Sequence, residues 1–198
     1  MYGILKDGAV LAEFVAPISV ISNQPTSRGD SLSLKVSFAQ SPAQRWEIEC
    51  RLEPFTWDAD RLFAHFTVKG QVSPYRVRMP QNTGVIRKRT SKSSIHQCSG
   101  SRDSTTLEIR DWTGYAPMGT FIKFDGHTKI YMLAEDLRTG DTTMEVYPPL
   151  RKSVANESFK HQDDVEMDVL LDTSAVRGMI YTDGILMDLG TVKFLEKL

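Results

Sequence analysis

The sequence predicts a mainly β protein, a β-sandwich or barrel with one helix, into which a second, small β-barrel is inserted. Three observations favour this class: segments in which apolar and polar residues strictly alternate, short apolar runs separated by turn dipeptides, and a single stretch with helical spacing. The chain has 198 residues, of which 40% are hydrophobic and 25% charged. That is ordinary globular composition with enough apolar material for a core.

The N-terminal segment predicts a hairpin followed by a loop. Ile4-Leu5 and Val10 to Phe14 are apolar and flank Asp7-Gly8, a turn dipeptide. Residues Ser22 to Asp30 are polar and contain a proline and a glycine, so we expect a loop there.

Two alternating runs follow and predict an antiparallel pair with a common apolar face across the break at 40–43. Their apolar positions are Leu32, Leu34, Val36 and Phe38 in the first run, and Trp46, Ile48, Cys50 and Leu52 in the second.

The period then changes, which predicts one helix near 57–69. Apolar residues at i, i+3, i+4 and i+7 form one face, Thr56 is a suitable N-cap, and Gly70 follows the expected end. An aromatic stripe on such a helix is typical of core packing rather than of a ligand site.

After a strand at Tyr75 to Met79, the chain from Gln81 to Thr106 is polar and predicts mobile loops around weak strands. Leu107 to Trp112 resumes a strand. The next segment predicts a three-stranded meander, with strands at Phe121 to Phe124, Lys129 to Ala134 and Thr142 to Tyr147. Its turns are at Asp125-Gly126 and Thr139-Gly140-Asp141, and Pro148-Pro149 ends it.

The last section predicts further strands, at Val165 to Leu171, Ile185 to Leu189 and Val192 to Leu195, with a turn at Asp183-Gly184. These strands need a sheet to join, and the simplest arrangement is that they complete the N-terminal sheets. Residues 1–80 and 162–198 would then form one discontinuous β-rich domain, and residues 81–161 an inserted OB-like (oligonucleotide-binding type) barrel.

No residue set predicts catalysis, a cofactor or a metal site, so we do not expect an enzyme. The histidines His65, His96, His127 and His161 are dispersed, without the spacing of metal ligands. The carboxylates Asp58, Asp60, Asp163 and Asp164 suit a helix start and a solvated linker. Cys50 and Cys98 are too few and too far apart in sequence for a disulfide framework, which fits a reducing cytosolic environment.

One basic cluster, Arg87-Lys88-Arg89 with Lys92, lies near Arg76 and Arg78 in sequence. In an OB-like barrel this cluster, together with Tyr115, Phe121 and Tyr131, would hold a nucleic-acid single strand by stacking and phosphate contacts. The alternative is a solvated loop or a charged contact between subunits. The net charge of −1 and pI near 6.4 favour the second interpretation.

Two features of the sequence bear on export and on membrane insertion. The first seven residues lack the basic-then-apolar order of a secretion signal, and the most apolar stretch, Phe14 to Ile21, is short and contains Pro17. We expect a protein that is neither exported by that route nor membrane-spanning.

The order of these elements carries a family resemblance. It rests on Met79-Pro80-Gln81 at the end of a strand, on Gly119 to Phe124 and Lys129 to Tyr131, on Glu145 to Leu150, and on the later strand Val169 to Leu171. In this order and patterning the chain resembles the distal tail proteins of siphophages, specifically the coliphage type with an inserted OB-like domain. These residues are structural, and the family has no catalytic residues to carry over.

The resemblance implies a structural virion protein at the distal end of a phage tail, assembled in the host cytoplasm. Six subunits would form a ring that contacts the tail-tube protein and the tail-tip hub, with fibre or collar proteins or a host saccharide at the outward barrel. DNA would pass through the lumen without specific binding. The segments 22–30 and 38–45 are candidates for contacts between neighbouring subunits or between stacked rings. The alternative is a free OB-like module that binds single-stranded nucleic acid or carbohydrate.

Overall fold

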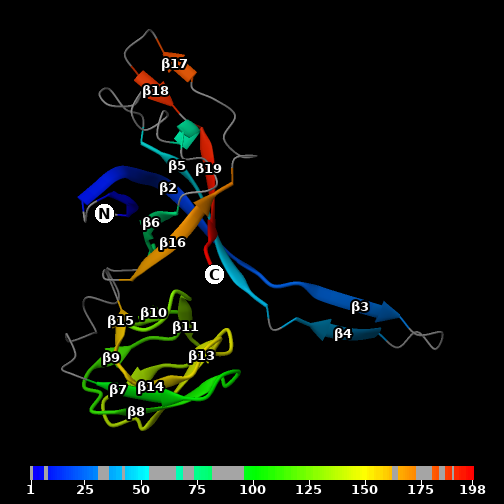
Figure 1. Ribbon diagram of the computed structural model, residues 1–198, viewed down its shortest axis with the longest axis vertical. Coiled ribbons are helices and arrows are strands. Elements are labelled where there is room, and N and C mark those ends of the chain that lie inside the picture. The colour runs from blue at the N-terminus through cyan, green and yellow to red at the C-terminus, as the bar shows by residue number, and fades with distance from the viewer. Residues whose placement is uncertain are drawn as a thin grey trace.

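The computed structural model confirms a mainly β protein (Figure 1). Helical residues within its described part are Phe66 to Val68. The rest of the helix expected near 57–69 lies outside the described residues. The structure describes residues 2–6, 9–30, 36–41, 43–53, 66–68, 74–81, 96–161, 165–172, 180–182, 186–188 and 190–198.

Six strands close into a barrel in the order β1-β2-β5-β19-β16-β6, with β6 pairing back to β1. The strands are β1 (Gly3–Lys6), β2 (Ala9–Asn23), β5 (Arg45–Leu52), β6 (Tyr75–Arg78), β16 (Glu166–Leu171) and β19 (Thr191–Glu196). The antiparallel pairing of β1 with β2 confirms the N-terminal hairpin. Because β19 pairs with β5 and β16 with β6, the C-terminal strands complete the N-terminal sheet, as the sequence predicted.

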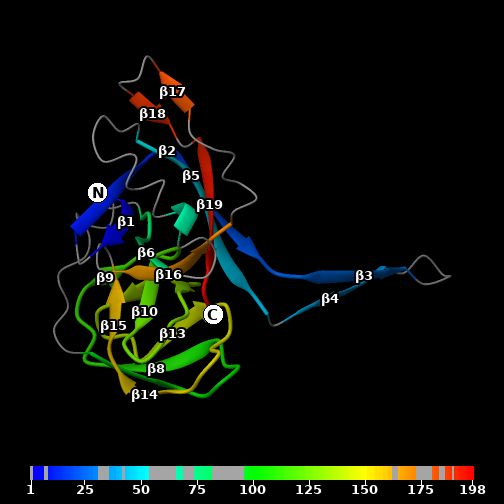
Figure 2. The same ribbon diagram turned by 45° about the horizontal axis from the view of Figure 1, so that its top comes forward.

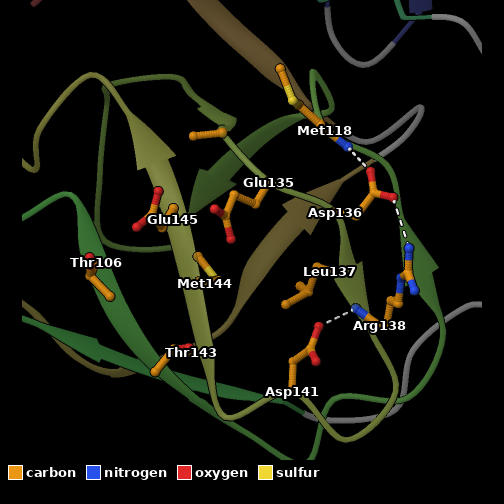
Figure 3. A pocket seen from close by; sticks show the side chains of 11 residues that line it. Thr106, Met118, Glu135, Asp136, Leu137, Arg138, Asp141, Thr143, Met144 and Glu145 are labelled. Carbon is orange, nitrogen blue, oxygen red and sulfur yellow. Dashed lines mark hydrogen bonds and ion pairs between the residues drawn. The ribbon is translucent and has the colours of Figure 1, made fainter.

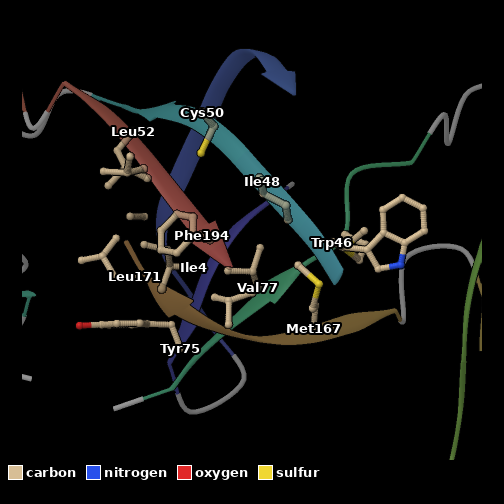
Figure 4. Packing of buried hydrophobic residues seen from close by; sticks show 14 of the residues in the cluster. Ile4, Trp46, Ile48, Cys50, Leu52, Tyr75, Val77, Met167, Leu171 and Phe194 are labelled. Atoms are coloured by element: carbon tan, nitrogen blue, oxygen red, sulfur yellow. The ribbon is translucent and has the colours of Figure 1, made fainter. Parts of the chain in front are cut away.

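The barrel core is built from the alternating apolar positions of these strands (Figure 4). Ile48 of β5, Val77 of β6 and Phe194 of β19 have no exposed surface. Their polar neighbours point outward because successive strand residues face opposite sides. Burial of this face is what fixes the register of each strand.

A β arm leaves the barrel and corrects two expectations. It consists of β3 (Thr26–Asp30) and β4 (Val36–Gln40), which pair with each other over their whole length. The segment 22–30, expected to be a loop, is therefore largely strand. The predicted pairing of the runs 32–38 and 46–52 is also wrong, because β4 pairs with β3, and β5 pairs with β2 and β19.

The position of the arm explains why the alternating pattern predicted the wrong strand pairing. β2 is 15 residues long and runs beside β5 beyond the rest of the barrel, so the chain continues outward instead of turning back at Ser22. Alternation shows that one face differs from the other, but it does not identify the partner strand. Both views show the arm extending away from the two larger β units (Figures 1 and 2).

A second β unit is formed entirely by residues 97–161, as one sheet ordered β14-β7-β8-β13-β11-β10-β15. Consecutive strands β14 and β15 occupy its opposite ends and are separated by Ser158 alone, so the sheet curls on itself. The strands are β7 (Gln97–Gly100), β8 (Thr106–Arg110), β10 (Phe121–Phe124), β11 (Tyr131–Leu133), β13 (Thr143–Tyr147), β14 (Val154–Glu157) and β15 (Phe159–His161).

The predicted meander is the centre of this unit. β10 pairs with β11 and β11 with β13, both antiparallel, as the turn signals indicated. A short additional pair, β9 (Tyr115–Ala116) with β12 (Leu137–Arg138), lies beside it. The unit has its own core, which includes Ile109, Phe124 and Leu133.

The chain leaves the barrel and returns to it at adjacent points. The backbone N–H of Met79 donates to the carbonyl of Val165 at 3.0 Å, on either side of the second unit. A separate hairpin of β17 (Ile180–Thr182) and β18 (Leu186–Asp188) precedes β19. The described residues include no helix with the length and hydropathy of a membrane span.

Candidate functional site

The aromatic residues proposed as a base-stacking platform do not form one. Tyr131 is fully buried in the core of the second unit. Phe121 packs edge-on against Trp46 of the barrel, with ring centroids 5.2 Å apart. The hydroxyl of Tyr115 donates to Asp136 at 2.8 Å. The basic cluster at 87–89 and Lys92 lies outside the described residues, as do Asp58, Asp60, Asp163 and Asp164.

The neighbouring cation Arg76 is matched by acids. On the outer barrel surface its guanidinium lies 3.5 Å from Glu166 and 3.6 Å from Asp168 of the adjacent strand β16. These cross-strand pairs follow from the register, which sets Arg76 opposite Asp168. The β6 surface is therefore locally neutralised.

The structure brings two of the dispersed histidines together. The rings of His96 and His161 lie 6.5 Å apart, around Trp112 and Phe159. His96 Nε2 accepts a hydrogen bond from the backbone N–H of Phe159 at 3.2 Å. No sequence signal predicts this cluster, because the two residues lie at the two ends of the second unit and meet only when its sheet curls. His65 lies outside the described residues.

His127 forms a separate contact between a hairpin turn and the β14–β15 bend. Its Nδ1 lies 3.2 Å from the Tyr131 hydroxyl, and its Nε2 3.9 Å from Glu157. Burial lowers the pKa of His127, against the opposing influence of Glu157. Across the part of the chain that the structure describes, no three His, Cys, Asp or Glu side chains converge as metal ligands would.

The best-organised polar cluster joins the barrel to the second unit, and we call it the junction cluster: Gln44, Trp46, Lys129, Ile130 and Glu196. The Glu196 carboxylate accepts backbone hydrogen bonds from Trp46 and from Ile130, each at 2.9 Å, and an ion pair from Lys129. Lys129 Nζ also donates to the side chain of Gln44 at 2.6 Å. Trp46 Nε1 donates to the Ile130 carbonyl at 2.8 Å.

Every polar group of this cluster is buried and paired, which a low-dielectric environment requires. The Lys129 side chain is 3% exposed and that of Glu196 0%. Burial lowers the pKa of Lys129 to about 8, although Glu196 opposes the shift. The cluster therefore fixes the second unit against the barrel, and it contains no group placed to act on a bound substrate.

A polar groove of about 660 Å³ opens on the second unit (Figure 3). Two of its carboxylates are committed to local structure: Asp136 accepts from the Met118 backbone N–H at 2.9 Å, and Asp141 from that of Arg138 at 2.6 Å. The first of these bonds and that from Tyr115 lower the pKa of Asp136. The side-chain carboxylates of Glu135 and Glu145 make no hydrogen bond or ion pair with other described residues. The groove can therefore accept hydrogen bonds from a polar ligand.

Comparison with protein-family models and with curated proteins returned no match for this chain.

Proposed function

We propose that this protein is the distal tail protein of a siphophage. Six copies would form a ring that joins the tail tube to the tail-tip and host-adsorption apparatus, and the protein would act as a structural component of the virion. The observation that carries this proposal is a closed barrel made from both sides of a second β unit, with a β arm projecting from it.

The arm supports assembly with other subunits. Among the described strands, β3 and β4 pair with each other and with no third strand, so the arm is a two-stranded ribbon that extends from the barrel. An isolated two-stranded ribbon is at best marginally stable in water, and exposed strand edges readily pair with a further strand. A contact of this kind between different surfaces of identical subunits is heterologous, and it closes into a ring when the rotation closes.

The rigid junction supports the division of roles between the two β units. The barrel and arm would make the ring and contact the tail-tube protein on one face and the tip hub on the other. The second unit, fixed by the junction cluster, would face outward with its groove toward fibre or collar proteins or a host saccharide. DNA would cross the lumen without specific binding.

The alternative of a free nucleic-acid-binding module receives less support. The buried Tyr131 and the barrel contact of Phe121 remove the stacking surface on which that function depends. A salt-dependent oligonucleotide titration separates the two functions. Tight binding that disappears when Arg87, Lys88 and Arg89 are neutralised would favour the module.

The direct test is electron microscopy of the purified protein, alone and with tail-tube protein, and of virions labelled on this protein. The expected result is a six-fold ring, located at the distal end of the tail in virions. Monomers under both conditions in vitro, with no label at the tail end, would overturn the proposal.

A further inference from the structure

A cleft of about 330 Å³ lies at the root of the arm, where β2 and β5 leave the barrel, and we call it the arm-root cleft. Its volume suits a small ligand or an inserted side chain. Two arginines line it, and none of its lining side chains is acidic. The lining residues are Asn23, Pro25, Ala43, Gln44, Arg45, Arg151 and Leu198.

Each of the two carboxylates next to the cleft also pairs with a lysine, so Arg45 shares its carboxylate partner and does not have it alone. Lys193 Nζ lies 2.7 Å from Glu47, and Lys129 pairs with Glu196. Burial alone would raise the pKa of Glu47, but hydrogen bonds led by that from Lys193 lower it to about 2. Of the two arginines that line the cleft, Arg45 shares Glu47 with Lys193, and Arg151 has no ion-pair partner among the described residues.

Both guanidinium groups keep donors for a ligand. Arg45 uses its Nε on Glu47 at 2.9 Å, and its side chain is 43% exposed. Arg151 donates one N–H to the Gln44 carbonyl at 3.0 Å. A guanidinium has five N–H donors, and its planar fork matches the two oxygens of a carboxylate.

Hydrogen bonds of the buried Gln44 side chain stabilise one wall of the cleft. Gln44 is buried, its amide nitrogen donates to Ser22 Oγ at 3.0 Å, and its amide oxygen accepts from Lys129 at 2.6 Å. The two arginines therefore lie next to a buried, hydrogen-bonded residue. Such preorganisation reduces the ordering cost of binding.

The rim adds a preference for a particular kind of anion. Pro25, Ala43 and Leu198 are exposed apolar residues around the charged centre. They suit the aliphatic part of an acidic side chain and its flanking residues. None of the lining residues is aromatic, so the cleft lacks the stacking surface with which proteins hold single-stranded nucleic acid.

We propose that the arm-root cleft is a docking site for an acidic peptide segment of a partner protein, whose glutamate or aspartate carboxylate binds between Arg45 and Arg151. This inference goes beyond ring formation and does not depend on it. A segment bound there would touch the barrel through Arg45, the second unit through Arg151 and the arm root through Pro25.

The test is fluorescence anisotropy of the full chain with a labelled short glutamate-rich peptide and with its glutamine counterpart. We expect the glutamate peptide to bind, the glutamine peptide not to bind, and the affinity to fall with added salt. Arg45→Gln and Arg151→Lys should each weaken binding about tenfold, since each alters one charged hydrogen-bonding partner. The Lys variant retains a charge near Gln44, which protects the fold.

The matched control is Arg110→Gln on β8, whose side chain is 70% exposed and distant in sequence from the cleft. It should bind like the wild type, and thermal unfolding should show that all variants are folded. Equal affinity of the wild type and the Arg45→Gln/Arg151→Lys double variant would overturn the proposal. Equal binding of the glutamine peptide, complete competition by inorganic phosphate at the same concentration, or tighter binding of an oligonucleotide would also overturn it.

Discussion

Lys129 of the second β unit and Glu196 of the last barrel strand form a fully buried ion pair across the junction of the two units. The same carboxylate accepts N–H donors from both units, Trp46 on the barrel side and Ile130 on the other. Residues 67 positions apart in sequence therefore decide how the units sit together. Breaking such a pair costs more than the pair contributes, because one charge stays buried without its partner.

The first prediction concerns this pair. Lys129→Met should lower the free energy of unfolding by about 3–5 kcal/mol, because it leaves the Glu196 carboxylate uncompensated. In urea denaturation, Lys129→Met/Glu196→Gln should cost less than the sum of the single variants. The exposed Lys160→Met, on β15, serves as control and should change stability by less than about 0.5 kcal/mol. Additive single effects would show that the two residues are not coupled.

The second prediction concerns the arm. The backbone N–H of Ser41 donates to the Pro25 carbonyl at 2.9 Å, so the two chains of the arm are already joined at its root. Replacing residues 26–40 by a short Gly-Ser linker should leave the barrel folded, with urea stability close to the wild type, and should abolish the proposed ring. Sedimentation velocity measures the assembly, and circular dichroism the fold. Rings of wild-type size from the excised protein would exclude the arm as the subunit contact.

The third prediction is a loss of stability on the acid side. His127 has a folded-state pKa below its ordinary value of 6.5, so the unfolded chain takes up the proton first. The stability that neutral His127 contributes is present above pH 6.5 and is lost as the pH falls through the lowered folded-state pKa. His127→Gln should flatten this part of the stability curve. Tyr131→Phe, which removes a partner but keeps the imidazole, should retain it.

The fourth prediction concerns β1. A Cβ at Gly3 would lie 2.1 Å from the carbonyl oxygen of Ala12 on β2. That oxygen is backbone, so Gly3→Ala must displace one barrel strand, and we expect a loss of about 3 kcal/mol, at the upper end for overpacking. Gly126→Ala is the comparison, because its Cβ would meet only the end of the Glu157 side chain, at 2.8 Å, and no backbone atom. Thermal unfolding should show the larger effect at Gly3, and the reverse order would contradict the β1–β2 register.

The fifth prediction concerns the two thiols. Burial raises the pKa of Cys50 and of Cys98 to about 12, with Glu49 adding to the shift at Cys50. At pH 8 only about one thiol in ten thousand would be ionised, and the thiolate is the reactive form. Iodoacetamide should therefore leave the native protein unlabelled and should label both cysteines in urea. Rapid labelling of the native protein at either position would show that its strand opens readily.

Several elements were predictable because their signals are local. The turn dipeptides between short apolar runs indicated the meander of β10, β11 and β13, and the strict alternation of Trp46 to Leu52 indicated β5. Polar stretches were less informative. The segment from Thr26 to Asp30 forms β3 although it contains no apolar run, because an arm strand need bury neither face.

The residues of the junction cluster and of the arm-root cleft are far apart in sequence, and no sequence pattern predicts that they meet. Lys129 begins one predicted strand and Glu196 follows another, and no sequence motif connects the two residues. Arg45 and Arg151 likewise meet at one cleft only because β5 leaves the barrel beside the end of the meander. Whether a side chain is exposed or buried depends on the residues that surround it in the folded protein. For this reason the sequence predicts Tyr131 as a stacking residue, whereas the structure places it in the core of the second unit.

The sequence by itself determined that this is a mainly β protein, because the periodicity of apolar residues reports the face that each strand buries. Only the tertiary structure decided which strands pair, that β3 and β4 form an arm, and that a buried lysine and glutamate join the two units. Those outcomes depend on long-range contacts, in which a strand of given periodicity can pair with any other of matching register. The free energy of the whole barrel selects among them.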